Sequence, residues 1–129
     1  MQTQDVIEQA VEAYAGGDAA ALDALLTEDL RYRINGQPDC GKYTRDVAGK
    51  AAFYDAVGEI LAWWEITGYR IVDLIVSGER AAAQVAHHAM HKETGRQFDT
   101  KLALFFAVKD GQITEIAEYH DTAALAREP

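Results

Sequence analysis

Three glycine-containing turns, Ser77-Gly78, Thr94-Gly95 and Asp110-Gly111, divide the second half of the chain. Such pairs between apolar runs are typical of β-hairpins, because glycine adopts the positive φ angles that tight turns require. The turns separate four strand-like runs, which cover residues 69–76, 80–92, 96–108 and 112–120. The pattern therefore predicts a four-stranded antiparallel meander and limits the chain to folds built on such a sheet.

The second run, within ERAAAQVAHHAMHKE, is rich in alanine, the strongest helix former. Its composition alone favours a helix. Turn signals bracket it at hairpin distances on both sides, however. We interpret the run as a strand, with a helix as the alternative.

Helical spacing of apolar residues dominates the first half of the chain. One helix begins near Thr3 and stops at Gly16-Gly17, a second has Asp18 as its N-cap and closes at Glu28-Asp29, and a third runs from about Lys50 to Leu61. Between the last two, LRYRIN predicts a short strand, and residues 36–49 predict a loop. We expect one α+β domain over residues 1–129, with the helices on one face of a curved antiparallel sheet and a pocket at the open end of the cone.

Composition excludes several classes of partner. The 129 residues are 49% hydrophobic and carry a net charge of −9, which argues against binding nucleic acid or anionic lipid. No apolar run approaches the ~20 residues that cross a bilayer, and the acidic N-terminal segment lacks the features of a signal peptide. Cys40 is the single cysteine, so we expect a cytoplasmic protein without an intrachain disulfide and interpret Cys40 as a structural thiol rather than a nucleophile.

Strand alternation assigns faces to the side chains. In the second run, His87 shares the more apolar face, which should pack on the helices and border the pocket. In the last run, Ile116, Glu118 and His120 share one face and Ile113 lies on the other. Composition does not decide which face of the last run points inward.

Three segments, VIEQAVEAYAGGDAAALDALLTEDLRYRI, GKAAFYDAV and TGRQFDTKLALFFAVKDGQITEIAEYHD, carry a family resemblance over nearly the whole chain. The chain resembles the nuclear transport factor 2-like superfamily, in the branch of SnoaL-like polyketide cyclases, limonene-1,2-epoxide hydrolase and ketosteroid isomerase. The resemblance implies a cone-shaped, cystatin-like fold and a homodimer. It identifies the reaction poorly, because this fold hosts many functions.

Two positions match residues that act in these families. By the resemblance, Glu118 lies where epoxide hydrolases have a catalytic aspartate, and Tyr32 matches the tyrosine that helps hold their attacking water. Glu118 is thus expected inside the cup.

Other positions depart from the families. His87 replaces the second aspartate of the epoxide hydrolases, and Val85 replaces the arginine between their aspartates. Ile34 lies where the hydrolases have an asparagine and roughly where ketosteroid isomerase has its base, although Asn35 could substitute for that base if the strand slips by one residue. Neither specific mechanism can therefore be copied.

The surviving candidates form an acid–base set. We expect Glu118 to act as the base, His87 as its orienting partner on a neighbouring strand, and Tyr32 as a hydrogen-bond donor to the developing oxyanion. The alternative is a buried Glu–His hydrogen bond that is purely structural. We expect the substrate to contact Tyr14, Ile34, Trp64, Val85, Leu102 and His120.

The cluster HHAMH could indicate a metal site, but the spacing of its histidines argues against one. On a strand, His87 and His91 lie ~13 Å apart, too far to share one ion. We expect His88 and His91 on the outer face or rim. Neither a metal nor a nucleotide cofactor is expected, since no phosphate-binding glycine loop is present either.

These observations favour an enzyme that uses cofactor-free acid–base chemistry, as an isomerase, cyclase or hydro-lyase, on a small and mostly apolar molecule. The alternative is a non-catalytic module that binds a small ligand or dimerises. The outer sheet face is too apolar for a solvated surface, so we expect a homodimer through it. Its apolar members are Ala82, Ala86, Met90, Ala103, Phe105, Ala107 and Tyr119.

Overall fold

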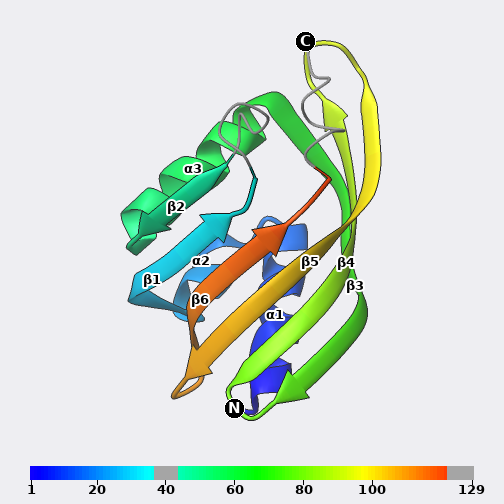
Figure 1. Ribbon diagram of the computed structural model, residues 1–129. Coiled ribbons are helices and arrows are strands. Elements are labelled where there is room, and N and C mark those ends of the chain that lie inside the picture. Colours follow the sequence, from blue (N-terminus) through cyan, green and yellow to red (C-terminus); the bar gives the residue numbers. More distant parts are fainter. Residues whose placement is uncertain (37–43, 122–129) are drawn as a thin grey trace.

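A curved six-stranded sheet, in the order β2-β1-β6-β5-β4-β3, forms one wall of the molecule (Figure 1). The computed structural model describes residues 1–36 and 44–121. The strands are β1 (Leu26–Ile34), β2 (Arg45–Ala48), β3 (Trp64–Ser77), β4 (Arg80–His91), β5 (Gln97–Lys109) and β6 (Gln112–Tyr119). The helices are α1 (Thr3–Ala15), α2 (Ala19–Ala24) and α3 (Lys50–Trp63).

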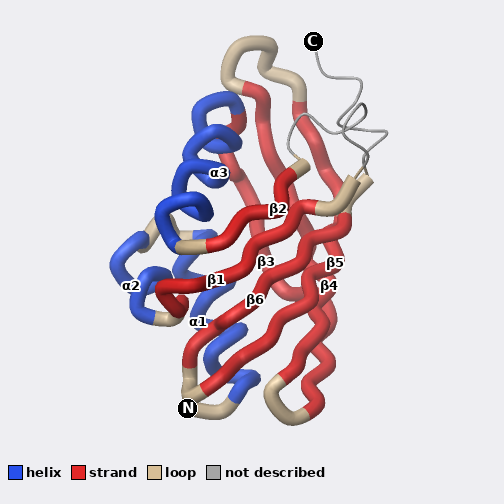
Figure 2. Tube along the Cα trace, turned by 60° about the vertical axis from the view of Figure 1, so that its left-hand side comes forward, coloured by secondary structure: helices blue, strands red, loops and turns tan. Residues whose placement is uncertain are grey.

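All three helices cover the same face of the sheet (Figure 2). α1 packs mainly on α2 and β3, whereas α3 packs on β1, β2 and β3. The α+β class predicted from the sequence is confirmed. Within the described residues, no helix is both long enough and apolar enough to cross a bilayer.

The four strands after α3 pair as predicted, each antiparallel to the next. The alanine-rich run is β4, in the interior of the sheet, so the strand interpretation is confirmed. Pairing with β3 on one side and β5 on the other overrides the helix propensity of its alanines. Ala81, Ala83 and Val85 alternate into the core, as the parity predicted.

Three predictions for the first half are wrong. α2 does not continue to Glu28-Asp29, because Leu26 already pairs with Ile113 of β6. The segment predicted as a loop, residues 36–49, contains β2, which pairs with β1; residues 37–43, and with them Cys40, lie outside the described residues. The sheet is also not purely antiparallel, because β1 and β6 run parallel.

A bulge in β6 changes the faces predicted for that strand. Ala107 pairs with Glu115 but Val108 pairs with Ile113, which leaves Thr114 as an extra residue. Ile113 and Ile116 therefore both face the helices, and the prediction that they lie on opposite faces is wrong. Beyond the bulge, Ile116, Glu118 and His120 share the inner side.

Candidate functional site

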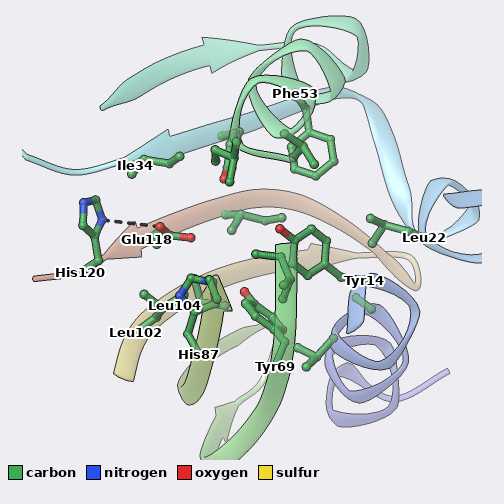
Figure 3. A pocket seen from close by; sticks show the side chains of 18 of the residues that line it. Tyr14, Leu22, Ile34, Phe53, Tyr69, His87, Leu102, Leu104, Glu118 and His120 are labelled. Atoms are coloured by element: carbon green, nitrogen blue, oxygen red, sulfur yellow. Dashed lines mark ion pairs between the residues drawn. The ribbon is translucent and has the colours of Figure 1, made fainter. Parts of the chain in front are cut away.

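A cavity of about 110 Å³, here called the inner cavity, lies between the sheet and the three helices (Figure 3). Most of the residues lining it are apolar. The polar ones among the described residues are Tyr14, Tyr32, Tyr69, His87, Glu118 and His120. An apolar enclosure with a few convergent polar groups is the usual form of a small-molecule site.

Glu118 is the single carboxylate among the described residues that line the inner cavity. β6 places it between β1 and β5, opposite Ile34 and Leu104. Its side chain is 17% exposed. Glu118 is therefore the one carboxylate of the described cavity lining that can accept a proton from a bound molecule.

Asn35 fixes the backbone at this point rather than replacing a catalytic base. Its backbone N and its side-chain Nδ2 both donate to the carbonyl oxygen of Glu118, at 2.9 and 3.1 Å. Asn35 is not among the residues that line the cavity. The Asn35 side chain, which could have substituted for the base missing at Ile34, thus holds the backbone of Glu118 in position instead.

His120 is the imidazole beside Glu118. Its Nδ1 lies 3.5 Å from Glu118 Oε2, and its side chain is only 2% exposed (Figure 3). Neither ring nitrogen has a hydrogen-bond partner within the described part of the chain. A buried imidazole with both nitrogens available can exchange protons with the carboxylate or with a ligand.

His87 lies farther from Glu118 than the sequence predicted. The expectation of neighbouring strands is wrong, because β5 lies between β4 and β6. The His87 ring contacts the rings of Tyr69 and Phe98, and in the described residues its buried Nδ1 has no hydrogen-bond partner. Burial lowers the pKa of His87, and the Glu118 carboxylate only partly opposes this effect, so the ring is neutral at neutral pH.

Three tyrosines complete the polar set. Tyr14 and Tyr32 were predicted, whereas Tyr69 was missed, because no face was assigned to the strand that begins with it. The Tyr14 and Tyr69 rings meet edge to face, with their centroids 4.8 Å apart. Burial raises the pKa of all three hydroxyls, and the charge on Glu118 adds to the effect. They therefore keep their protons and can donate hydrogen bonds.

The remaining predicted contacts divide into two groups. Ile34, Trp64 and Leu102 line the inner cavity, but Val85 does not. Val85 is fully buried in the hydrophobic core on a strand against which α1 packs, so it is shielded from the cavity.

The other two histidines differ from each other. His88 is on the outer face, paired with Asp99 at 2.7 Å. The prediction of the outer face or rim is wrong for His91, which is buried against Trp63 and Trp64 and whose Nδ1 accepts from the backbone of the following turn. Among residues 1–36 and 44–121, no three His, Cys, Asp or Glu side chains are grouped so that they could hold a metal ion.

Comparison with known proteins agrees with this architecture. An NTF2-like protein from Burkholderia xenovorans LB400 is 26% identical, with 97% of this chain and 93% of that chain covered and a TM-score of 0.81. A candidate polyketide cyclase from Pseudomonas putida KT2440 is 24% identical over 94% and 92% of the two chains, with a TM-score of 0.76. A cystatin-like protein of unknown function from Xanthomonas campestris is 18% identical over 93% and 91%, with a TM-score of 0.78.

None of the curated proteins compared with the chain matches it. The family model of the SnoaL-like domain, in contrast, matches residues 7–116, which include both the bulge of β6 and most of the cavity. The chain therefore belongs to the SnoaL-like domain family.

Proposed function

We propose that the chain is an enzyme that performs cofactor-free acid–base chemistry, as an isomerase, cyclase or hydro-lyase, on a small and mostly apolar carbonyl compound. The observation that carries the proposal is one carboxylate, Glu118, in a cavity with three tyrosines whose hydroxyls stay protonated. The family match and the similarity to a candidate polyketide cyclase agree with it.

In the proposed reaction, Glu118 takes a proton from the carbon next to a carbonyl group. The electron pair of the broken C–H bond moves onto the carbonyl oxygen, to which a tyrosine hydroxyl donates a hydrogen bond. Return of the proton to another carbon gives isomerisation. Attack of the enolate carbon on a second carbonyl closes a ring, and the alkoxide formed there takes the proton back from Glu118. Loss of a hydroxyl group, which takes the proton as it leaves, gives dehydration.

The two imidazoles have different parts in this proposal. His120, 3.5 Å from the carboxylate, receives and returns protons. His87, which is neutral, offers one hydrogen bond to a polar group of the substrate instead of orienting Glu118. Tyr32 and Tyr14 are the donors expected from the sequence, and Tyr69 is a third.

The modest size of the inner cavity favours a second candidate function. Its volume of about 110 Å³ is below the roughly 300–1,000 Å³ that small-molecule pockets usually have. A non-catalytic module that binds a small ligand or dimerises would need no more room.

We also propose that the protein is a homodimer through the outer sheet face. Phe105 and Tyr119 lie on that face with 46% and 48% of their surfaces exposed, and their rings contact each other. Ala103 pairs with Tyr119 and extends the apolar patch. Ala86 adds little to the exposed apolar patch, because it is buried. It pairs with Arg70 of β3 and with Lys101 of β5.

Exchange of α-protons for deuterium, followed by NMR with small ketones and 1,3-diketones in D₂O, tests the enzyme proposal directly. We expect the wild type to catalyse exchange and Glu118→Gln to lose at least about a hundredfold in rate. Glu115→Gln is the matched control, since Glu115 lies in the same strand but pairs with Arg33 away from the inner cavity. Binding without exchange in the wild type would favour the non-catalytic candidate.

A further inference from the structure

A second cavity, of about 470 Å³, opens between α1–α2 and α3. We call it the outer groove. Its α1–α2 side is built from small residues, including Ala13, Ala15, Gly17 and Ala19. Its α3 side has Tyr54 and Leu61, and the start of β3 forms its floor. α3 packs on the strands rather than closely against α1 or α2, which leaves this space open.

The outer groove adjoins the inner cavity. Six residues line both: Tyr14, Leu22, Phe53, Val57, Trp64 and Ile66. Figure 3 shows Phe53, Tyr14 and Leu22 at this end of the cavity, on the side away from His120. A molecule bound at Glu118 that passed between these side chains would enter the groove.

Size and chemistry indicate what such a molecule is. The inner cavity alone is small for an organic ligand, but the two spaces together fall within the usual range for a ligand pocket. The walls of the groove are mostly apolar, and among the described residues that line it the charged ones are Asp18, Glu65 and Lys92. Asp18 accepts from the backbone of α2, and Lys92 donates to the carbonyl of Leu61, so both already serve the fold.

We propose that the substrate is an elongated, uncharged carbonyl compound whose apolar chain lies in the outer groove while its carbonyl group lies at Glu118. This inference rests on the proposed function, because Glu118 and the tyrosines supply the polar end of the site. The occupant of the groove is a part of the substrate itself, because the groove shares six lining residues with the cavity that holds Glu118.

A series of linear 2-alkanones, from 2-butanone to 2-nonanone, measures the use of the groove by calorimetric titration. Each methylene buried in the groove should tighten binding about threefold, so that the dissociation constant falls by more than about 100-fold over the series. A matching series of 1-alkanols tests the apolar chain without the carbonyl group.

Two alanines on α2 give a matched pair of variants. Ala19 lines the outer groove but not the inner cavity, and its neighbour Ala20 is exposed and lines neither. We expect Ala19→Trp to weaken binding of 2-nonanone at least tenfold and to change that of 2-butanone less than twofold. Ala20→Trp should leave both ketones unaffected, which separates groove filling from a general effect on α2.

The outcomes test the groove proposal and the proposed function separately. Short ketones that bind with no gain from added length, or an Ala19→Trp variant that weakens all lengths equally, would overturn the groove and leave the proposed function intact. Length-dependent binding of alkanols alone would support the groove and refute the carbonyl specificity. Failure of both series to bind would overturn both proposals.

Discussion

Asn35→Ala removes one of the two hydrogen bonds that hold the backbone carbonyl of Glu118. The other donor, the backbone N of Asn35 at 2.9 Å, remains. Since one hydrogen bond contributes about 0.5–1.5 kcal/mol, we expect the free energy of unfolding to fall by about 1 kcal/mol. The melting temperature should fall by about 4 °C. A less well-positioned carboxylate should slow α-proton exchange roughly tenfold through kcat.

Asn35→Asp distinguishes positioning from catalysis at this residue. A carboxylate there would face the carbonyl oxygen of Glu118 in place of an N–H donor, so we expect a larger loss of stability than with alanine. No rate is gained, because residue 35 does not line the cavity. Gln112→Ala is the control, since it removes side-chain bonds to backbone carbonyls at the other end of β6. An Asn35→Asp variant that exchanges faster than wild type, or a Gln112→Ala variant as slow as Asn35→Ala, would refute this reasoning.

Three further predictions follow from the same contacts. Glu118→Gln should keep the free energy of unfolding within about 1 kcal/mol of wild type, because no hydrogen bond to its side chain is lost in the described residues; a larger loss in thermal melts would favour the structural interpretation. Because the pKa of His87 is lowered in the fold, the unfolded chain takes up a proton first below about pH 6.5, so stability should fall with pH in that range. In denaturant unfolding, the stability of His87→Gln should fall less with decreasing pH than that of the wild type. His88→Gln should show no such weakening of the pH dependence. Phe105→Lys should convert the proposed dimer to a monomer in light scattering, while Glu12→Lys on α1 should not; a wild-type monomer would contradict the dimer.

Local signals in the sequence were sufficient for much of the fold. The glycine turns and the alternation between them predicted β3 to β6, and Asp18 predicted the start of α2, where its carboxylate accepts from Ala21. The parallel pairing of β1 with β6 joins segments more than 70 residues apart, so no local pattern reports it. β2 is four residues long and has no extended alternation, which explains why its segment predicted a loop.

Strand parity and the family resemblance together predicted most of the site. Glu118 follows the bulge of β6, so parity alone did not decide its face, and the family resemblance placed it in the cup. Tyr69 was missed because residues 69–76 were given no inner or outer face, and a bulge between Ile66 and Gly68 separates Tyr69 from the alternation of the preceding residues. The distance between His87 and Glu118 depends on the order of strands in the sheet, which pairwise hairpin signals do not fix.

The electrostatic state of the inner cavity restricts which molecules can react there. Its described lining includes one carboxylate, no lysine and no arginine, and its tyrosines and His87 stay neutral because burial opposes their charged forms. An anionic ligand would lose its hydration without gaining a cationic partner and would face the charge on Glu118. A neutral carbonyl compound avoids both costs, and it acquires negative charge only as Glu118 takes its proton and becomes neutral. The site is therefore suited to stabilising charge that develops during proton transfer rather than charge that the substrate brings with it.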